Sequence, residues 1–335
     1  MPLVNTVYMP VRSHQKKFYI FGNMKILLIT LCMFAGHTLT AQTVKYYDYK
    51  WKECDISLAR FFSVKQQTDS GWLVEDSYLA TKKLQMKGLY KDEACKITNG
   101  KFTYFYPNQQ ISSTGYYSNG KRNGIWLSFH YNGMMRDSTN YEKGAPKAIS
   151  LGWHDNGVMA DSTVYGVNGL DVHVYWFDNG NPSSSGRTLN DKKQGTWRYF
   201  HKNGNTAALE KYDADVLISR TYYDEQGTQL ADTSNRDHDA VFKGNQVKWK
   251  NYMENNLVFP RGVKLVNADV ITVVLVATVS EEGKVENVYV DIPFDPLFDD
   301  EALRVMKRSP KWVAAIDHNR SIKTIIRQAV SFSQD

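Results

Sequence analysis

The chain has 335 residues, which is long enough for two domains of ordinary size. Its 41 basic and 35 acidic side chains leave a formal net charge of only +6, and no run of Lys or Arg exceeds two residues. So weak a positive charge argues against a nucleic-acid partner. The 21 Tyr and 8 Trp instead indicate β structure, because aromatic side chains pack well on a pleated surface.

The segment from Met24 to Gln42 is typical of a secretory signal. One Lys precedes an apolar run from Ile26 to Gly36, and small and polar residues follow it. As a helix this run covers about 16 Å, which is too short for a hydrocarbon core of about 30 Å. We therefore expect cleavage after Ala41, so that residues 1–41 are an upstream extension and signal peptide and Gln42 begins the exported protein.

An uncleaved anchor from Phe18 to Gly36 is the alternative interpretation of this region. Arg12, Lys16 and Lys17 would then lie on the cytoplasmic side of the membrane. Such an anchor would contain Lys25, at a cost of about 2.5–3.5 kcal/mol if that residue were central.

Two cysteines, Cys54 and Cys95, are left once the signal is removed. Export places them in an oxidising compartment, where a disulfide between them would close a loop of about 40 residues. The alternative is two unrelated thiols, one or both of them buried.

Internal repetition is the strongest signal in the chain and covers residues from about 84 to 232. Asn-Gly pairs, or related pairs, recur at intervals of 24, 24, 23, 24 and 23 residues, with their second members at Gln109, Gly133, Gly157, Gly180, Gly204 and Gly227. An aromatic residue lies four positions before each of these: Phe105, Phe129, Trp153, Trp176, Phe200 and Tyr223. Eight positions after the pair, four of the first five units have a tyrosine: Tyr117, Tyr141, Tyr165 and Tyr212.

This template predicts a series of β-hairpins. An Asn-Gly pair supplies positive φ at low steric cost and favours a tight turn. The aromatic residues on either side would occupy two antiparallel strands and pack across the hairpin and onto the next unit. Because a lone hairpin is marginal in water, we expect the units to stack into one long twisted sheet within residues 42–232, with Trp72 to Tyr90 as a degenerate capping unit.

The segments Gly124 to Gly133 and Gly195 to Gly204 share the pattern Gly-x-Trp-x-x-Phe-x-x-Asn-Gly. They resemble MORN-type repeats, especially those of proteins labelled YwqK-like antitoxins. The resemblance implies an architecture and no particular activity, because such repeats occur in many settings.

Three histidines, His130, His154 and His201, share one position of the repeat, which Phe177 occupies in another unit. Equivalent side chains in adjacent units are two strands apart, or roughly 10 Å. Zinc–nitrogen bonds are only about 2.0–2.1 Å long. No two of the histidines can therefore share a metal ion, and we interpret them as surface residues.

The period fails after Asp232, and residues 233–245 are predicted to be a linker. Residues 246–335 then have a compact α+β pattern, with strands at 270–279 and 285–292, a helix at 299–308 and a last strand at 321–332. The predicted fold is therefore mainly β: an extended antiparallel sheet of repeated hairpins, followed by a small strand-strand-helix-strand module.

Residues 250–333, approximately, resemble the C-terminal domain of TonB proteins. The motifs that carry the resemblance are Phe259-Pro260, Glu282-Gly283-Lys284-Val285, Leu297-x-x-x-Glu301-Ala302-Leu303, Pro310-x-Trp312 with Ala315, and Ala329-Val330-Ser331-Phe332. The chain departs from that family at Ala314, where the family usually has Pro, and in a shorter loop before the last strand.

The resemblance implies a peptide-binding module of the Gram-negative periplasm. In TonB proteins the last strand lies at a sheet edge and accepts a segment of an outer-membrane receptor as an added strand. Carried over by position, this edge would consist of Thr324, Ile325, Ile326, Arg327, Gln328 and Ala329. The alternative is that the repeat domain or a second copy covers the edge and leaves it a structural role only.

We expect a non-enzymatic periplasmic binding or adaptor protein of the cell envelope, whose partner is an envelope protein or an outer-membrane receptor peptide. The sequence contains no nucleophile–base pair, metal-ligand cluster or phosphate-binding glycine loop, so we expect no cofactor and no metal. The runner-up is a TonB-type energy transducer for outer-membrane transport, anchored in the inner membrane by the uncleaved N-terminal segment. Only 9 Pro are present, and the Pro-rich spacer of such a transducer is missing. A homodimer is compatible with either hypothesis.

Overall fold

The structure, a computed structural model, describes residues 43–244, 246–265 and 270–334. Both interpretations of the N-terminal segment, and the cleavage site at Ala41 and Gln42, lie outside these residues. Within the described ranges, no helix is long and apolar enough to cross a membrane.

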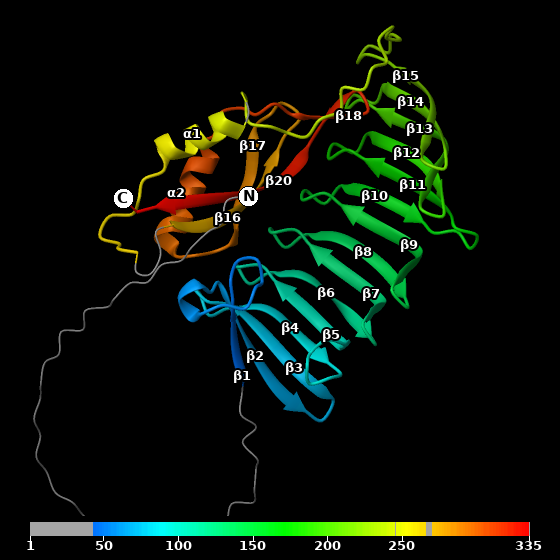
Figure 1. Cartoon of the computed structure of the whole chain (residues 1–335). Helices are drawn as coiled ribbons and strands as arrows, with labels where there is room; N and C mark the ends of the chain where they lie inside the picture. The colour runs from blue at the N-terminus through cyan, green and yellow to red at the C-terminus, as the bar shows by residue number, and fades with distance from the viewer. Residues whose placement is uncertain (1–42, 245, 266–269, 335) are drawn as a thin grey trace, which may run out of the picture.

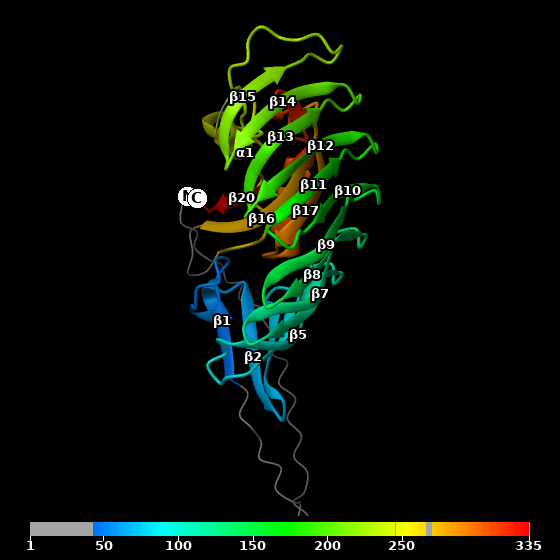
Figure 2. The same cartoon turned by 90° about the vertical axis from the view of Figure 1, so that its right-hand side faces the viewer.

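Within this described part of the chain, a single antiparallel sheet of 15 strands is the largest element, and every strand pairs with its neighbours in sequence. Figures 1 and 2 show this sheet as a curved and twisted ribbon. A short 3₁₀ helix, η1 (Ile56–Leu58), follows the first strand. The strands are β1 (Thr43–Tyr47), β2 (Phe61–Thr68), β3 (Gly71–Tyr78), β4 (Leu84–Tyr90), β5 (Thr98–Phe105), β6 (Ile111–Ser118), β7 (Lys121–Phe129), β8 (Met135–Glu142), β9 (Ala145–Trp153), β10 (Met159–Val164), β11 (Leu170–Trp176), β12 (Pro182–Leu189), β13 (Lys192–Phe200), β14 (Thr206–Asp213) and β15 (Val216–Tyr222). The predicted mainly β fold and its extended sheet of hairpins are confirmed.

The Asn-Gly turns close the hairpins along one side of the sheet, where the strands end. In the turn after β7, the Gly133 N–H donates to the His130 carbonyl, and the His130 N–H donates to the Met134 carbonyl, both at 2.8 Å. Gly133 has a φ of 85°, so the positive φ predicted for the pair is carried by its glycine. This geometry is a three-residue loop that ends in a left-handed residue.

The asparagine of each turn also links its unit to the next one. Its Oδ1 accepts the backbone N–H two residues further on. Its Nδ2 donates to a carbonyl in the following turn at 2.7–3.1 Å, in the pairs Asn108–Tyr131, Asn132–Asp155, Asn156–Asp178, Asn179–Lys202 and Asn203–Glu225. Asparagine therefore recurs because it satisfies both its own turn and the neighbouring unit.

The repeat histidines make a second contact between units, and our interpretation of them as surface residues was wrong. Nε2 of His130, His154 and His201 lies 2.7–2.9 Å from the carbonyl oxygen of the next unit's repeat aromatic, namely Trp153, Trp176 and Tyr223. His201 is buried and the other two are half-buried. A spacing of two strands prevents a shared metal ion but still allows each imidazole to reach the neighbouring backbone.

Buried aromatic residues pack on one face of the sheet in two clusters. Phe102 and Trp126 belong to the first, and Trp197, Tyr199 and Tyr222 to the second. Of the repeat aromatics identified in the sequence, Tyr212 is buried in the second cluster, whereas the six that precede the turns are only half-buried. Aromatic residues at several positions of the repeat therefore hold the sheet together, and the sequence template included only some of them.

The described residues after β15 form two helices and two smaller sheets. The order β17-β16-β20 defines a three-stranded antiparallel sheet, and β18 pairs with β19. The elements are α1 (Gln246–Asn256), β16 (Val270–Val279), β17 (Val285–Ile292), α2 (Pro296–Lys307), β18 (Ala315–Asp317), β19 (Arg320–Ile322) and β20 (Thr324–Ser333). Trp249 of α1 and Phe298 and Met306 of α2 pack against Ile271 and Leu275 of β16 in one core.

Two local features of this region differ from the sequence expectation. Helix α2 begins at Pro296, because the Asp295 side chain accepts the Leu297 N–H at 2.9 Å and proline is favoured at the first helical position. Residues 233–245, predicted to be a linker, are not entirely free of regular structure, since His238 forms an isolated β-bridge with Ile316 of β18. The division into domains itself remains a prediction.

Candidate functional site

The β20 strand lies at the edge of its sheet. Among the described residues its only strand partner is β16, which it pairs along its whole length from Thr324 to Ser333. Ile326, Val330 and Phe332 turn towards the core that contains α1 and α2. The six residues predicted to form a binding edge, 324–329, therefore lie together on the free rim of this sheet.

The other side of β20 presents an exposed row of side chains. Ile325 is 70% exposed, and Arg327 and Ala329 are exposed as well. Arg327 Nε donates to Asp291 Oδ2 of β17 at 2.8 Å, so its side chain lies across β16. A free strand edge offers unpaired backbone donors and acceptors, which is the chemistry needed to accept an added strand.

The three-stranded sheet is docked along the row of Asn-Gly turns of the large sheet, as Figure 1 shows. Tyr289 of β17 stacks on Tyr131, with ring centroids 4.0 Å apart. Asn287 Nδ2 donates to Asp155 Oδ2 of the next turn at 2.7 Å. Docking therefore uses the repeat turns themselves, and the orientation of β20 relative to the large sheet follows from it.

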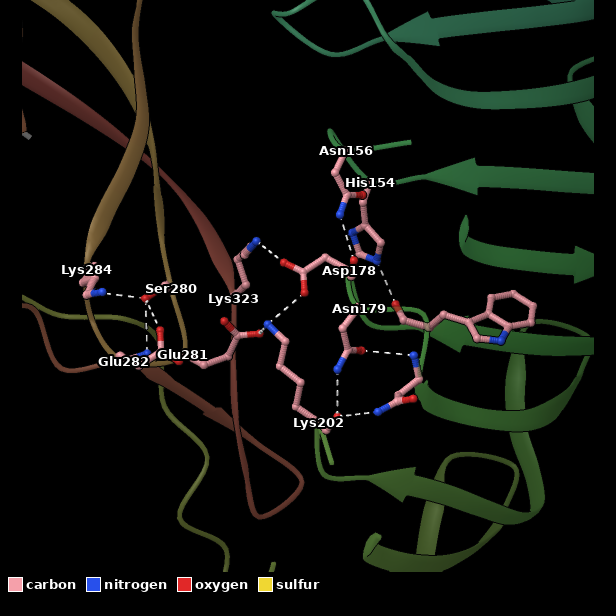
Figure 3. Close-up of polar contacts among 12 residues, drawn as sticks. His154, Asn156, Asp178, Asn179, Lys202, Ser280, Glu281, Glu282, Lys284 and Lys323 are labelled. Atoms are coloured by element: carbon pink, nitrogen blue, oxygen red, sulfur yellow. Dashed lines mark hydrogen bonds and ion pairs between the residues drawn. The ribbon is translucent and has the colours of Figure 1, made fainter. Parts of the chain in front are cut away.

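An ion cluster ties the start of β20 to two further turns (Figure 3). Asp178 pairs with Lys323, and with Lys202 at 2.8 Å, and Lys202 also pairs with Glu281 at 2.8 Å. Burial by itself raises the pKa of Asp178, but the hydrogen bonds from both lysines outweigh it and hold the pKa at about 2. Asp178 is therefore charged throughout the ordinary pH range and keeps both lysines in place.

Arg320 of β19 supplies a donor at the unit where the repeat lacks its histidine. Phe177 occupies the histidine position there and offers no donor to the Phe200 carbonyl. Arg320 Nη1 donates to this carbonyl at 3.1 Å, and also to the carbonyl and hydroxyl of Ser183. Arg320 is only 7% exposed, so its charge is buried between the two parts of the chain.

A buried carboxylate, Glu210 of β14, contacts the turn between β18 and β19. Its Oε2 lies 2.9 Å from His318 Nδ1, and Arg220 Nε lies 3.4 Å from its Oε1. The His318 ring stacks on Tyr199, with centroids 3.7 Å apart. Burial acts to raise the pKa of Glu210, yet its contacts with His318, Tyr212 and Arg220 lower it overall. Glu210 is therefore an ionised anchor for the docked turn.

One group of metal-ligand type occurs in the part of the chain that the structure describes. Oxygen or nitrogen atoms of Asp237, Asp317 and His318 lie within 4.8 Å of one another. Asp237 already accepts the His318 backbone N–H at 2.9 Å, and Arg320 Nη2 lies 3.6 Å from Asp317. These contacts, and that of His318 with Glu210, already occupy the three side chains. We therefore interpret the group as part of the contacts between the C-terminal region and the repeat sheet.

Cys54 and Cys95 are free thiols, both half-buried, and this corrects the predicted disulfide. Cys54 follows β1, where its N–H donates to the Tyr46 carbonyl at 3.0 Å. Cys95 lies in the connection between β4 and β5 with a φ of 53°. Each thiol is held by its own loop, and partial burial raises the pKa of both.

The docking residues were not found by sequence reasoning, which singled out only β20 in this region. Their contacts join residues as far apart in sequence as Arg320 and Ser183. The one feature of the sequence that could have indicated this docking was Phe177, an apolar residue at a repeat position that is otherwise polar. Comparison with known proteins adds no assignment, because no protein-family model and no curated protein matches the chain.

Proposed function

We propose that the chain is a non-enzymatic adaptor of the cell envelope, exported to the periplasm by its N-terminal signal, whose β20 edge binds an extended segment of a partner protein. In this proposal the C-terminal region is a small α+β module of the TonB type, and the partner is an envelope protein or an outer-membrane receptor peptide. The observation that carries it is the free rim of β20, with Ile325 and Arg327 exposed beside it.

Strand addition suits this edge for a physical reason. Main-chain hydrogen bonds between β20 and an added strand would supply affinity, and contacts with alternate side chains would supply selectivity. The exposed apolar side chain of Ile325 is available for such a contact.

The docked large sheet supports a scaffold role in the same proposal. Contacts from Tyr289, Asn287, Lys323 and Arg320 hold the three-stranded sheet in one orientation. A rim that is already ordered loses less conformational entropy when a partner binds. The repeat sheet would therefore act as a rigid support that presents the rim.

Paired proline substitutions test this proposal. Along an antiparallel edge strand, backbone N–H groups point alternately to the neighbouring strand and to the free rim. Of Ile325→Pro and Ile326→Pro, one therefore breaks the ladder with β16 and the other removes a rim donor, and Ile326→Pro also removes a side chain that packs on the core. Amide hydrogen exchange of the parent protein identifies the rim variant, because only an N–H that pairs with β16 is protected.

Peptides selected from a phage-displayed dodecapeptide library on the purified chain are the probe. We expect selected peptides to protect β20 amides from hydrogen exchange and to bind the rim variant about tenfold more weakly or worse, since each lost hydrogen bond is worth ~1 kcal/mol and proline also obstructs the strand. Peptides that bind the parent protein and the rim variant equally, or that protect another surface from exchange, would refute the proposal.

A further inference from the structure

Eight asparagines of the chain are followed directly by glycine: Asn99, Asn119, Asn123, Asn132, Asn156, Asn168, Asn179 and Asn203. In such a pair the glycine nitrogen can attack the side-chain amide carbon of the asparagine, because glycine has no Cβ to obstruct the approach. The new bond joins this nitrogen to Cγ, the bond from Cγ to Nδ2 breaks, and Nδ2 leaves as ammonia with the proton of the glycine N–H. Water then opens the cyclic imide at either carbonyl, which leaves an aspartate or an isoaspartate. All eight pairs have the chemistry for deamidation, so the fold decides which of them react.

The four pairs in the repeat turns are held by two contacts each. Oδ1 of Asn132, for example, accepts the Met134 N–H at 3.1 Å, and its Nδ2 donates to the Asp155 carbonyl at 2.7 Å. Ring closure would have to break both hydrogen bonds, since Cγ must turn towards the glycine and Nδ2 must depart. The same two contacts are made by the other repeat asparagines, Asn156, Asn179 and Asn203. The hydrogen bonds that stack the units therefore also protect these amides.

Asn168 lies in a turn of the same shape but without this protection. In the loop that joins β10 to β11, the Gly169 N–H donates to the Gly166 carbonyl at 3.2 Å, and Gly169 has a φ of 71°. The repeat turn after β7 has the equivalent bond from Gly133 to His130 and a φ of 85° at its glycine. The amide of Asn168, however, makes no hydrogen bond to any residue that the structure describes. Its Cγ is therefore free to turn towards the Gly169 nitrogen.

Exposure to water does not distinguish the two kinds of turn. Asn168 and Asn132 are both exposed, so the water that opens the imide reaches each of them. The glycine of each turn also uses its N–H in a turn hydrogen bond. The difference that remains is the hydrogen bonding of the asparagine side chain.

The other three pairs are each restrained at one point. Oδ1 of Asn99 accepts the Asn119 N–H at 3.2 Å, and Oδ1 of Asn119 accepts a hydrogen bond from Lys91 Nζ at 3.1 Å. Asn123 belongs to β7, where it pairs with Tyr116 of β6. We expect these three to react more slowly than Asn168.

We propose that Asn168 is the site at which this protein deamidates. The reaction needs only water, and it places a carboxylate, or an isoaspartate with one more backbone carbon, in the loop between β10 and β11. The inference rests on the geometry of the turns and is independent of what β20 binds.

Peptide mapping by mass spectrometry, over a time course in mildly alkaline buffer, tests this assignment on the purified chain. We expect Asn168 to convert about tenfold or more faster than any repeat asparagine, because two hydrogen bonds must break before a repeat amide can react. A parallel incubation in concentrated urea separates structure from sequence. Unfolding removes the protecting contacts, so the rates of Asn168 and of the repeat asparagines should become similar.

Asn168→Gln should abolish the fastest conversion, because the longer side chain cannot close the same ring. Asn132→Gln is the matched control, in a turn of the same shape, and it should leave that conversion unchanged. Three outcomes would overturn the proposal: an Asn168 that stays intact while the urea sample reacts, a faster reaction at another Asn-Gly pair of the folded chain, or a preference for Asn168 that persists in urea.

Discussion

The guanidinium of Arg320 lies over the ring of Phe177, with its carbon Cζ 5.5 Å from the ring centroid. Phe177 occupies the position where neighbouring units have a histidine that bonds to the next unit. The arginine therefore takes over the hydrogen bond to the Phe200 carbonyl and also covers the ring that replaced the imidazole. The repeat sheet and the C-terminal region are complementary at this position.

Arg320→Ala is expected to lower the free energy of unfolding by about 2–4 kcal/mol, because the half-buried carbonyls of Ser183 and Phe200 lose the donor that the buried guanidinium supplies. Adding Phe177→His should restore part of this loss, since His154 reaches the equivalent carbonyl of Trp176 at 2.9 Å. Urea denaturation of the parent, both single variants and the double variant measures the coupling. Additivity to within about 0.5 kcal/mol would contradict the assigned relationship.

Gly186→Ala tests how closely β12 approaches Trp197. A Cβ at Gly186 would lie 2.1 Å from the indole, whose Nε1 is held by the Arg187 carbonyl at 3.0 Å. We expect a loss of about 1–3 kcal/mol in unfolding free energy and a shift of the Trp197 indole N–H resonance, because the ring must move.

Gly204→Ala is the comparison for that variant. Gly204 has a φ of 93° and no atom within 4 Å of its Cβ position, so only the backbone is strained and the loss should be about 1 kcal/mol. The Trp197 resonance should stay in place. A Trp197 shift in both variants would mean that the close approach of Gly186 is not its cause.

Asp299→Asn should make the protein less sensitive to pH. Burial raises the pKa of Asp299 to about 7, although the Phe294 N–H donates to it at 2.9 Å. Because the folded-state pKa lies above the unfolded value of 3.8, the contribution of this group to stability is fully present below pH 3.8 and is lost as the pH rises to about 7.

The asparagine is permanently neutral and keeps an oxygen for the Phe294 N–H. We therefore expect the variant to match the parent near pH 4 and to exceed its unfolding free energy by about 1–3 kcal/mol at pH 8. Urea denaturation at the two pH values measures this difference. Burial also raises the pKa of Asp76, to about 6, so the parent's own slope includes both groups and only the difference between the proteins isolates Asp299. A difference that does not change with pH would count against the assigned cause.

Local chemistry made the large sheet predictable. The turn at Asn132-Gly133 depends on the few residues around it, and its recurrence every 23 or 24 residues dictated hairpin after hairpin. The alternation of β20 was also readable, because Val330 and Phe332 enter the core on one face of the strand. The interpretation of the repeat histidines as surface residues failed for a different reason. His154 bonds to a carbonyl 22 residues away, and only the stacked units bring the two groups together.

Sequence alone determined the repeat, the antiparallel order and the position of the last strand, because turns and alternating patterns act between residues close in the chain. Tertiary structure alone decided that the C-terminal sheet docks on the row of turns. That contact depends on Arg320 meeting Phe200 and His318 meeting Glu210, pairs separated by more than a hundred residues in sequence. No local preference encodes such a pairing, since each side chain obtains its partner only when the folded sheet has positioned both.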